Sequence, residues 1–294
     1  MASLPVYRYE WPSPNPKAVV HILHGMMEHA GRYAHLAHTL NQAGFAVTAH
    51  DHQGHGKTCS PDHYGQLDNS CWDQFLADTH TQILKTKAQY PGIPLVLFGH
   101  SMGSFLAQAY TLEHPTEPAA LVLSGSGWQD SGIKLGESVA RWGTALWGPL
   151  SQARLLQKLV FGPYNLHFFP TRTSCDWISR DKGEVDRYLA DPACGFGCSF
   201  GFFAGFFKGL SKLFSPAQTF ETLPKTLPLY LFGGSQDPVG GYGKASRALA
   251  DRYLKAGLSN LVFTLYDGAR HECINETNRE QVYADLIAFL ARFQ

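Results

Sequence analysis

The sequence predicts an α/β fold with a mostly parallel central sheet that is covered by helices on both faces. Short apolar runs rich in β-branched residues alternate along the chain with longer amphipathic stretches. The apolar runs are nearly continuous, which is typical of strands buried on both faces. Several of these runs end in glycine and a polar residue. Polar groups are therefore expected at the carboxyl edge of the sheet, where active sites form in such folds.

Six runs predict the strands, and five amphipathic stretches predict the helices that follow them. The predicted strands cover residues 17–25, 44–51, 94–101, 119–126, 227–237 and 260–268. The predicted helices cover residues 31–43, 70–89, 102–113, 241–256 and 277–292. Because a helix follows nearly every strand, we expect a succession of parallel strand–helix–strand units.

Residues 127–226 interrupt this alternation. They contain no convincing strand of the same type and are rich in Trp and Phe. We therefore expect a helical lid at 127–226, inserted into a single α/β core that is formed by residues 1–126 and 227–294.

The lid contains an aromatic and glycine-rich run, CGFGCSFGFFAGFFKGL, at residues 194–210. Its glycines recur every fourth residue, which on a helix makes a bare stripe that allows close packing. The adjacent row contains Phe196, Phe200, Phe203 and Phe207. These aromatics form either the core of the lid or the wall of a site for an acyl chain, with Phe203 and Phe207 as candidate substrate-binding residues.

Composition and charge exclude several classes of function. The chain has 24 basic and 24 acidic residues among 294, so its net charge indicates neither a nucleic-acid partner nor an anionic membrane. No apolar stretch is long enough to cross a bilayer, and the N-terminus does not resemble a signal peptide. The six cysteines form no CxxC pair. We expect free thiols and a reducing, cytoplasmic location.

The segment TAHDHQGHGKT, residues 48–58, raises the question of a metal site because it concentrates histidines around Asp51. The zinc hydrolase pattern closest to this spacing, H-x-H-x-D-H, needs an aspartate where the chain has Gly54. We therefore predict no metal here and a structural role for His55, whose ring would hold this loop near the site.

The segment GHSMG, residues 99–103, fits the G-x-S-x-G pattern of a nucleophile elbow. A predicted strand precedes it and a predicted helix follows it, as the elbow requires. The two glycines allow the sharp turn that lifts the serine hydroxyl above the sheet. Ser101 is therefore the predicted catalytic nucleophile.

A serine hydroxyl needs a general base and an orienting carboxylate. In this strand order they are expected after the nucleophile, first the acid and then the histidine. Asp237 and His271 follow the last two predicted strands and fit these roles. Asp267 is the alternative acid, although a carboxylate so close to His271 is more typical of a turn. His100 precedes the nucleophile and is expected to pack or hydrogen-bond instead.

Two backbone N–H groups are needed to stabilise the tetrahedral intermediate. One is expected from Met102, the residue after the nucleophile. The other is expected from Met26, in the loop HILHGMMEHAGRY that follows the first predicted strand. The sequence thus predicts an oxyanion hole made by Met26 and Met102.

The segments HGMMEHAGRY, DHQGHGKT, GHSMGS, SQDPVG and GARHE together resemble the monoacylglycerol lipase and lysophospholipase branch of the α/β-hydrolase superfamily, among the serine aminopeptidase S33-type hydrolases. The resemblance implies a lid inserted after the sixth strand and hydrolysis of glycerolipid esters through an acyl-enzyme, without a cofactor. It also implies that Glu28 and Arg32 help to bind the polar head group. Two positions depart from the family pattern: Met26 replaces a small residue, and Gln53 replaces a frequent arginine.

Other functions remain open at this stage. The same triad would serve a small-ester esterase, a thioesterase or an amidase or aminopeptidase, and a ligand-binding protein can retain the fold. The expected partner is a small lipid ester, with no nucleic acid and with transient contact between the lid and a membrane surface. The sequence does not determine the oligomeric state.

Overall fold

The computed structural model describes residues 5–128, 132–215 and 218–293, and in these residues seven strands form one sheet. The order across the sheet is β1-β3-β2-β4-β5-β6-β7. Strand β1 (Arg8–Trp11) pairs antiparallel with β3, and all other neighbours are parallel. The predicted fold class is confirmed. Residues 1–4 lie outside the described residues. They belong to the N-terminal segment in which we expect no signal peptide.

All six predicted strands are present. They are β2 (Val19–Leu23), β3 (Ala46–His50), β4 (Leu95–His100), β5 (Ala120–Ser124), β6 (Leu229–Gly234) and β7 (Leu261–Tyr266). Strand β1 is not predicted from the sequence, because its RYEW segment is polar and short. An edge strand that is paired on one side needs no continuous apolar run.

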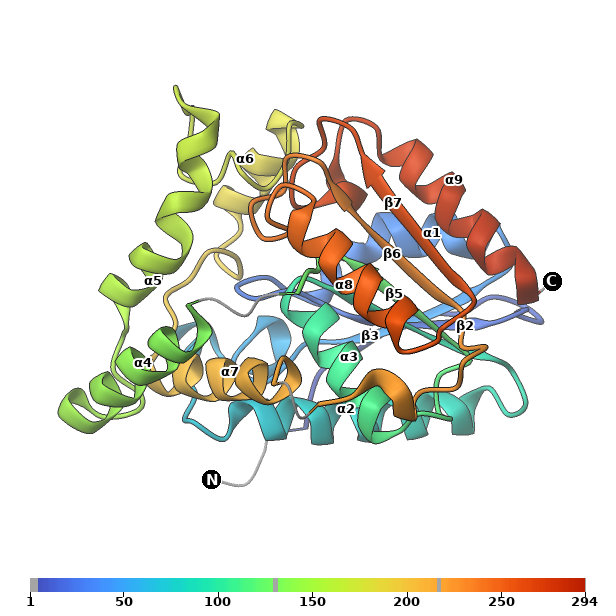
Figure 1. Cartoon of the computed structure of the whole chain (residues 1–294), viewed down its shortest axis with the longest axis horizontal. Coiled ribbons are helices and arrows are strands. Elements are labelled where there is room, and N and C mark those ends of the chain that lie inside the picture. Colours follow the sequence, from blue (N-terminus) through green and yellow to red (C-terminus); the bar gives the residue numbers. More distant parts are fainter. Residues whose placement is uncertain (1–4, 129–131, 216–217, 294) are drawn as a thin grey trace.

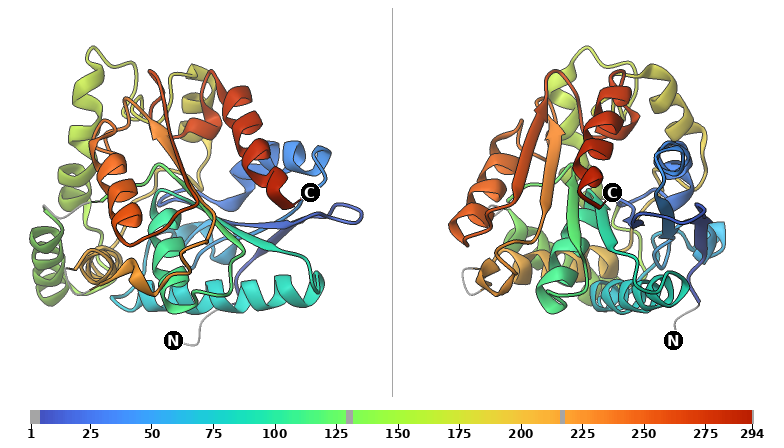
Figure 2. Two further views of the ribbon diagram at one scale, coloured as in Figure 1. Left: turned by 45° about the vertical axis from the view of Figure 1, so that its right-hand side comes forward. Right: turned by 90° about the vertical axis from the view of Figure 1, so that its right-hand side faces the viewer.

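The five predicted core helices are also present, and they cover both faces of the sheet (Figures 1 and 2). Helices α1 and α9 lie on one face, and α2, α3 and α8 lie on the other. Their bounds are α1 (Ala34–Gln42), α2 (Cys71–Gln89), α3 (Met102–Glu113), α8 (Lys244–Lys255) and α9 (Arg279–Leu290). A short 3-10 helix, Ala30–Tyr33, precedes α1.

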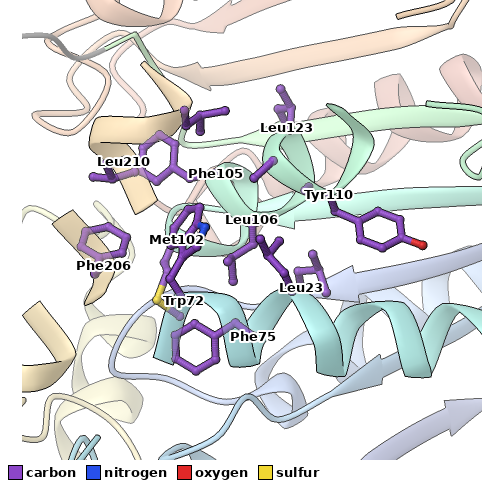
Figure 3. Packing of buried hydrophobic residues seen from close by; sticks show 14 of the residues in the cluster. Leu23, Trp72, Phe75, Met102, Phe105, Leu106, Tyr110, Leu123, Phe206 and Leu210 are labelled. Atoms are coloured by element: carbon purple, nitrogen blue, oxygen red, sulfur yellow. The ribbon is translucent and has the colours of Figure 1, made fainter. Parts of the chain in front are cut away.

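The hydrophobic core has two layers because successive side chains of a strand point to opposite faces. On β4, Leu97 belongs to the layer under α2 and α3, whereas Phe98 belongs to the layer under α1 and α9. Figure 3 shows the first layer, in which Phe105 and Leu106 of α3 lie near Trp72 and Phe75 of α2. Both faces of the sheet are therefore buried, as the continuous apolar runs predict.

The inserted segment is helical, as expected. Helices α4 (Ile133–Trp147), α5 (Arg154–Phe161), α6 (Lys182–Ala190) and α7 (Phe200–Leu213) connect β5 to β6. The insertion therefore follows the fifth strand of the described chain, and the expected position after the sixth strand is wrong. The reason is that only one short strand, β1, precedes β2 in the described residues.

Helix α7 fastens the inserted segment to the core through its glycine stripe, and it lies alongside α2 in Figure 1. A Cβ atom on Gly201 would lie 2.5 Å from the Leu67 carbonyl oxygen, and one on Gly205 would lie 2.6 Å from Cys71 Sγ. A Cβ on Gly209 would overlap the Trp72 ring. The predicted close packing along this stripe is confirmed.

Among the described residues, no helix combines the length and the apolar character needed to cross a membrane. All six cysteines are free thiols, as predicted.

Candidate active site

The predicted nucleophile elbow lies between β4 and α3. Ser101 has φ 51° and ψ −120°, a strained conformation for a residue with a side chain. Its N–H donates to the Ser124 carbonyl oxygen at 2.9 Å. A Cβ atom on Gly99 or Gly103 would overlap backbone atoms of the neighbouring turn or of β2. The glycines are therefore required by close backbone approach, and the predicted local structure is confirmed.

Asp237 and His271 lie in the loops after β6 and β7, and the fold brings them together. His271 Nδ1 donates to Asp237 Oδ1 over 3.0 Å, and both side chains are buried. The Val239 N–H donates to the same carboxylate oxygen at 2.8 Å. Burial by itself would lower the pKa of His271, but the charge of Asp237 and its hydrogen bond outweigh burial and raise that pKa above its ordinary value.

Ser101 and His271 line the same small cavity. Gly125 allows this approach, because a Cβ atom at its position would lie 2.9 Å from His271 Cε1. Gly125 also has a positive φ of 58°, which favours glycine. The three residues predicted from separate motifs therefore converge at the carboxyl edge of the sheet.

The alternatives to these residues have other contacts. The Asp267 carboxylate is exposed and accepts a hydrogen bond from Ser235 Oγ at 3.3 Å. His100 Nδ1 lies 3.1 Å from Ser124 Oγ, and burial lowers the pKa of His100 to about 4. The expected hydrogen-bonding role of His100 is confirmed, and Asp237 rather than Asp267 contacts the histidine.

Met26 and Met102 both line a larger cavity together with Ser101. Met102 is the first residue of α3, and the first N–H groups of an α-helix have no acceptor within the helix. The Met26 loop is held from two sides. Its Gly25 N–H donates to Glu28 Oε1 at 2.6 Å, and the Met27 carbonyl oxygen accepts from the Tyr188 hydroxyl of the inserted segment at 3.1 Å.

Glu28 and Arg32 belong to a buried ion-pair network. Arg32 donates to Glu28 Oε2 at 2.6 Å and to both carboxylate oxygens of Glu272 at 2.8 and 2.7 Å. Burial opposes the charges of Glu28 and Arg32. The pKa of Glu28 nevertheless lies below its ordinary value, mainly because of Arg32, and the two carboxylates hold the pKa of Arg32 well above its own. The network joins the Met26 loop to the His271 loop.

The two residues expected at the head group differ in their positions. Glu28 and Glu272 line the small cavity with Ser101 and His271. Arg32 does not line it, and its guanidinium group is hydrogen-bonded to both carboxylates. Glu28 is therefore exposed to the small cavity, whereas Arg32 contacts it only through the two carboxylates.

The larger cavity has a volume of about 380 Å³ and a mainly apolar lining. Its wall includes Phe206, Phe207 and Leu210 of α7 and residues of α4 and α5. Phe207 therefore lies where the sequence analysis expects it. Phe203 does not, because its side chain is fully buried and contributes to the core. Phe206 and the α4 and α5 residues were missed, and the amphipathic RLLQKLVF sequence of α5 was the available signal.

The loop at 48–58 has a structural role. The Asp51 carboxylate accepts hydrogen bonds from the backbone N–H groups of Ala30 and Lys57, both at 2.7 Å. The His55 ring packs against Phe75, Phe196 and Phe202. These contacts confirm the predicted role of His55 in fixing the loop.

Gln53, which replaces the frequent arginine of the family pattern, donates from Nε2 to Asp78 Oδ2 at 3.1 Å. A neutral amide therefore contacts this carboxylate, where an arginine would bring a positive charge.

The family model described as serine aminopeptidase, S33, matches residues 14–278 of the chain. The match includes every segment that builds the elbow, the Asp237 and His271 loops and the two cavities. The chain belongs to this family. The expected membership of the α/β-hydrolase superfamily is thereby confirmed.

Individual relatives place the chain in the expected branch of the family. It is 31% identical to the monoacylglycerol lipase of Mycolicibacterium smegmatis over 97% of the chain and 92% of that protein. It is 32% identical to the human monoglyceride lipase over 90% of the chain and 78% of that protein. A thermostable carboxyl esterase from Bacillus coagulans, solved with glycerol, superposes with a TM-score of 0.86 at 26% identity, covering 98% of both chains.

Proposed function

We propose that this enzyme is a serine carboxylester hydrolase that cleaves single-chain glycerolipid esters, with monoacylglycerols preferred over lysophospholipids. The observation that carries the proposal is that two unequal cavities share Ser101 in their linings. The larger one is apolar and matches an acyl chain. The smaller one contains carboxylates and matches a short polar alcohol.

In the proposed mechanism, Ser101 Oγ attacks the ester carbonyl while His271 removes its proton. Asp237 holds the imidazole through Nδ1 and stabilises its positive charge. The backbone N–H groups of Met26 and Met102 donate to the developing oxyanion. The imidazolium then protonates the leaving alcohol, and water hydrolyses the acyl-enzyme with His271 again as the base. This mechanism uses no cofactor.

The alcohol portion is proposed to lie in the small cavity. Glu28 accepts hydrogen bonds from Gly25 and Tyr33 at Oε1 and from Arg32 at Oε2, so Oε2 retains one acceptor position for a substrate hydroxyl. Carboxylates favour the hydroxyl groups of glycerol and disfavour the negative phosphate of a lysophospholipid. This charge argument, together with the monoacylglycerol lipase relatives, favours monoacylglycerols over lysophospholipids.

Residues 127–226 are proposed to act as a lid over the core formed by residues 1–126 and 227–294. Helices α4 and α5 form the left side of Figure 1 and carry large apolar side chains that face solvent. Trp142 and Leu155 are each 72% exposed, and Phe169 is 83% exposed. Exposed apolar groups of this size fit the interface of a phospholipid surface. We therefore propose a cytoplasmic enzyme that docks at membranes through its lid.

The test is the hydrolysis of a series of monoacylglycerols, with lysophosphatidylcholine and p-nitrophenyl acetate alongside. We expect medium and long monoacylglycerols to be the best substrates. Ser101→Ala should reduce turnover by about a thousandfold or more, because the nucleophile is lost. Ser60→Ala, which removes an exposed hydroxyl on a loop, is the matched control and should keep full activity.

Other outcomes would contradict the proposal in distinct ways. Turnover of the acetate ester alone would indicate a small-ester esterase. Preference for lysophosphatidylcholine would place the phosphate in the small cavity, against the charge argument. Absence of Ser101-dependent turnover on every ester would indicate an amide substrate or a ligand-binding protein.

A further inference from the structure

Outside the Ser101 site, three potential metal ligands meet where the inserted segment touches the Met26 loop. They are His29, Asp191 and Cys194, and one ligand atom of each lies within 4.8 Å of the others. His29 Nε2 and Asp191 Oδ2 are already 2.9 Å apart. Among the described residues this is the single group of at least three such side chains, and it is separate from the histidines of residues 48–58.

The local backbone presents two of these ligands from one tight turn. The Cys194 N–H donates to the Asp191 carbonyl oxygen at 3.0 Å. The Ala193 N–H donates to Asp191 Oδ1 at 2.8 Å, which leaves Oδ2 directed to His29. The Asp191 carboxylate and the backbone of the turn that carries Cys194 are thus held in place before any ion binds, which limits the conformational entropy that binding would cost.

We propose that His29, Asp191 and Cys194 bind a divalent transition-metal ion, with Zn²⁺ as the best match. Imidazole nitrogen, carboxylate oxygen and thiolate sulfur are the three donor types of protein zinc sites, and a soft sulfur ligand disfavours Mg²⁺ and Ca²⁺. A tetrahedral Zn²⁺ site needs ligand atoms about 3.3–3.6 Å apart. Binding would therefore widen the 2.9 Å separation of His29 Nε2 and Asp191 Oδ2, and it would require Cys194 Sγ, which lies within 4.8 Å of both atoms, to take up the same spacing. The Cys194 thiol proton is released to solvent as the sulfur binds.

The surrounding charges favour a dication at this position. Glu28, Arg32 and Glu272 all lie within electrostatic range of Cys194. Two carboxylates and one guanidinium leave one net negative charge, and Asp191 adds another. The site opens to solvent on the side of His29 and Asp191, whose side chains are 18% and 35% exposed, whereas Cys194 is buried.

The ion would fasten the inserted segment to the Met26 loop. The Gly195 N–H and the Tyr188 hydroxyl already donate to the Met27 carbonyl oxygen, so a metal at His29 would reinforce an existing contact. We expect bound Zn²⁺ to raise the melting temperature by stabilising the folded state alone. We also expect slower ester turnover, and this last point rests on the proposed function.

The experiment is calorimetric titration of the full chain with ZnCl₂ and, in parallel, absorption spectroscopy with Co²⁺. The proposal expects one ion per chain and a thiolate-to-cobalt charge-transfer band. Cys194→Ser should remove the band and weaken Zn²⁺ binding at least about tenfold, and Asp191→Asn should weaken it too. Cys175→Ser, another lid cysteine, and His38→Ala, an exposed histidine, are the matched controls and should bind as the parent does.

Several results would overturn the proposal. The first is the absence of saturable binding at millimolar metal. The others are a cobalt spectrum without the thiolate band, and equal binding by Cys194→Ser and the parent. Melting curves without metal verify that each variant is folded. Because binding is read without substrate, failure of the metal site and failure of the proposed esterase activity are distinguishable.

Discussion

At the scale of single residues, the proposed catalytic pair Asp237–His271 has an altered proton affinity. The imidazole is buried, and burial alone would make it a weaker base. The adjacent carboxylate reverses this effect and raises the pKa of His271 above its ordinary value. Since a general base must be neutral, activity is expected to fall as the pH drops through this raised pKa.

Replacement of Asp237 by Asn should change both the rate and its pH dependence. The amide cannot stabilise the imidazolium, so the pKa of His271 should fall and the acid limb of kcat/KM should move to lower pH. We also expect kcat to fall by about three to four orders of magnitude, as in triads that lose their carboxylate. Stopped assays of ester hydrolysis across the acid range measure both effects.

Asp267→Asn provides the control for this prediction. Asp267 precedes His271 by four residues, but its carboxylate bonds to Ser235 and is exposed. Its variant should retain the parent rate and pH profile. If Asp267→Asn produced the larger loss, the assignment of Asp237 as the orienting acid would be wrong.

At the scale of elements, the packing of α4 against α7 determines the shape of the larger cavity. Gly136 of α4 faces Phe207 of α7, and both line the cavity. A Cβ atom on Gly136 would lie 2.8 Å from the Phe207 ring. The Phe207 ring is a side chain and can therefore shift, whereas backbone atoms could not. The space into which it can shift is part of the cavity.

Gly136→Ala is therefore expected to shorten the acyl chain that the enzyme accepts. Alanine in this helix does not reduce helix propensity, so the variant should melt at or above the parent temperature. The preference between long-chain and short-chain monoacylglycerols should move toward short chains by about fourfold for each methylene excluded. The measurement is kcat/KM over the acyl series.

Gly162→Ala is the matched substitution, because a Cβ atom there meets no other atom within 4 Å. It should leave the acyl preference unchanged. An unaltered chain-length profile in Gly136→Ala would mean that Phe207 does not limit the acyl chain.

At the scale of the whole molecule, a set of buried histidines makes the fold sensitive to acid. Burial lowers the pKa of each below its ordinary value, to about 3 for His50 and about 4 for His55. Both ring nitrogens of His52 are buried without a hydrogen-bond partner among the described residues. The full set is His21, His24, His50, His52, His55 and His100.

The sign of the pH effect follows from linkage. These histidines bind protons more readily in the unfolded chain, so their contribution to stability is present above their unfolded pKa of about 6.5 and is lost as the pH falls toward the folded values. Each contributes a slope of about 1.4 kcal/mol per pH unit across that window. We expect the melting temperature to fall steeply below about pH 6.

His52→Phe tests this explanation. Phe removes two unpartnered ring nitrogens and still packs on Phe75, whose ring centroid lies 5.3 Å from that of His52. Calorimetry across the acid range gives the slope of the unfolding free energy against pH. In the variant this slope should correspond to about one proton fewer taken up on unfolding. His63→Phe, on an exposed position, should keep the parent slope. A slope that His52→Phe does not alter would assign the acid sensitivity to other groups.

Local sequence patterns predicted much of this protein, because they report on contacts made within a few residues. The elbow at Ser101 needs glycines on either side, and Asp237 and His271 each follow an apolar strand. Parallel strands bring the ends of such segments to one edge, so three separate motifs were enough to predict one site. The glycine stripe of α7 was read from its spacing in the same way.

Tertiary structure alone decided the contacts between residues that are far apart in the chain. Arg32 and Glu272 are 240 residues apart, and no local pattern indicates that their side chains meet. Phe203 and Phe207 share one face by spacing, yet Phe203 is buried in the core and Phe207 lines the cavity. The side chains of His29 and Asp191, which are 162 residues apart in the chain, also meet.

The sequence by itself determined the fold class and the residues expected to react, because these depend on periodicity and on local turns. The lining of the cavity, the ion pairs of Glu28 and the junction between the inserted segment and the core depend on which surfaces pack together. Only the folded chain brings those surfaces into contact.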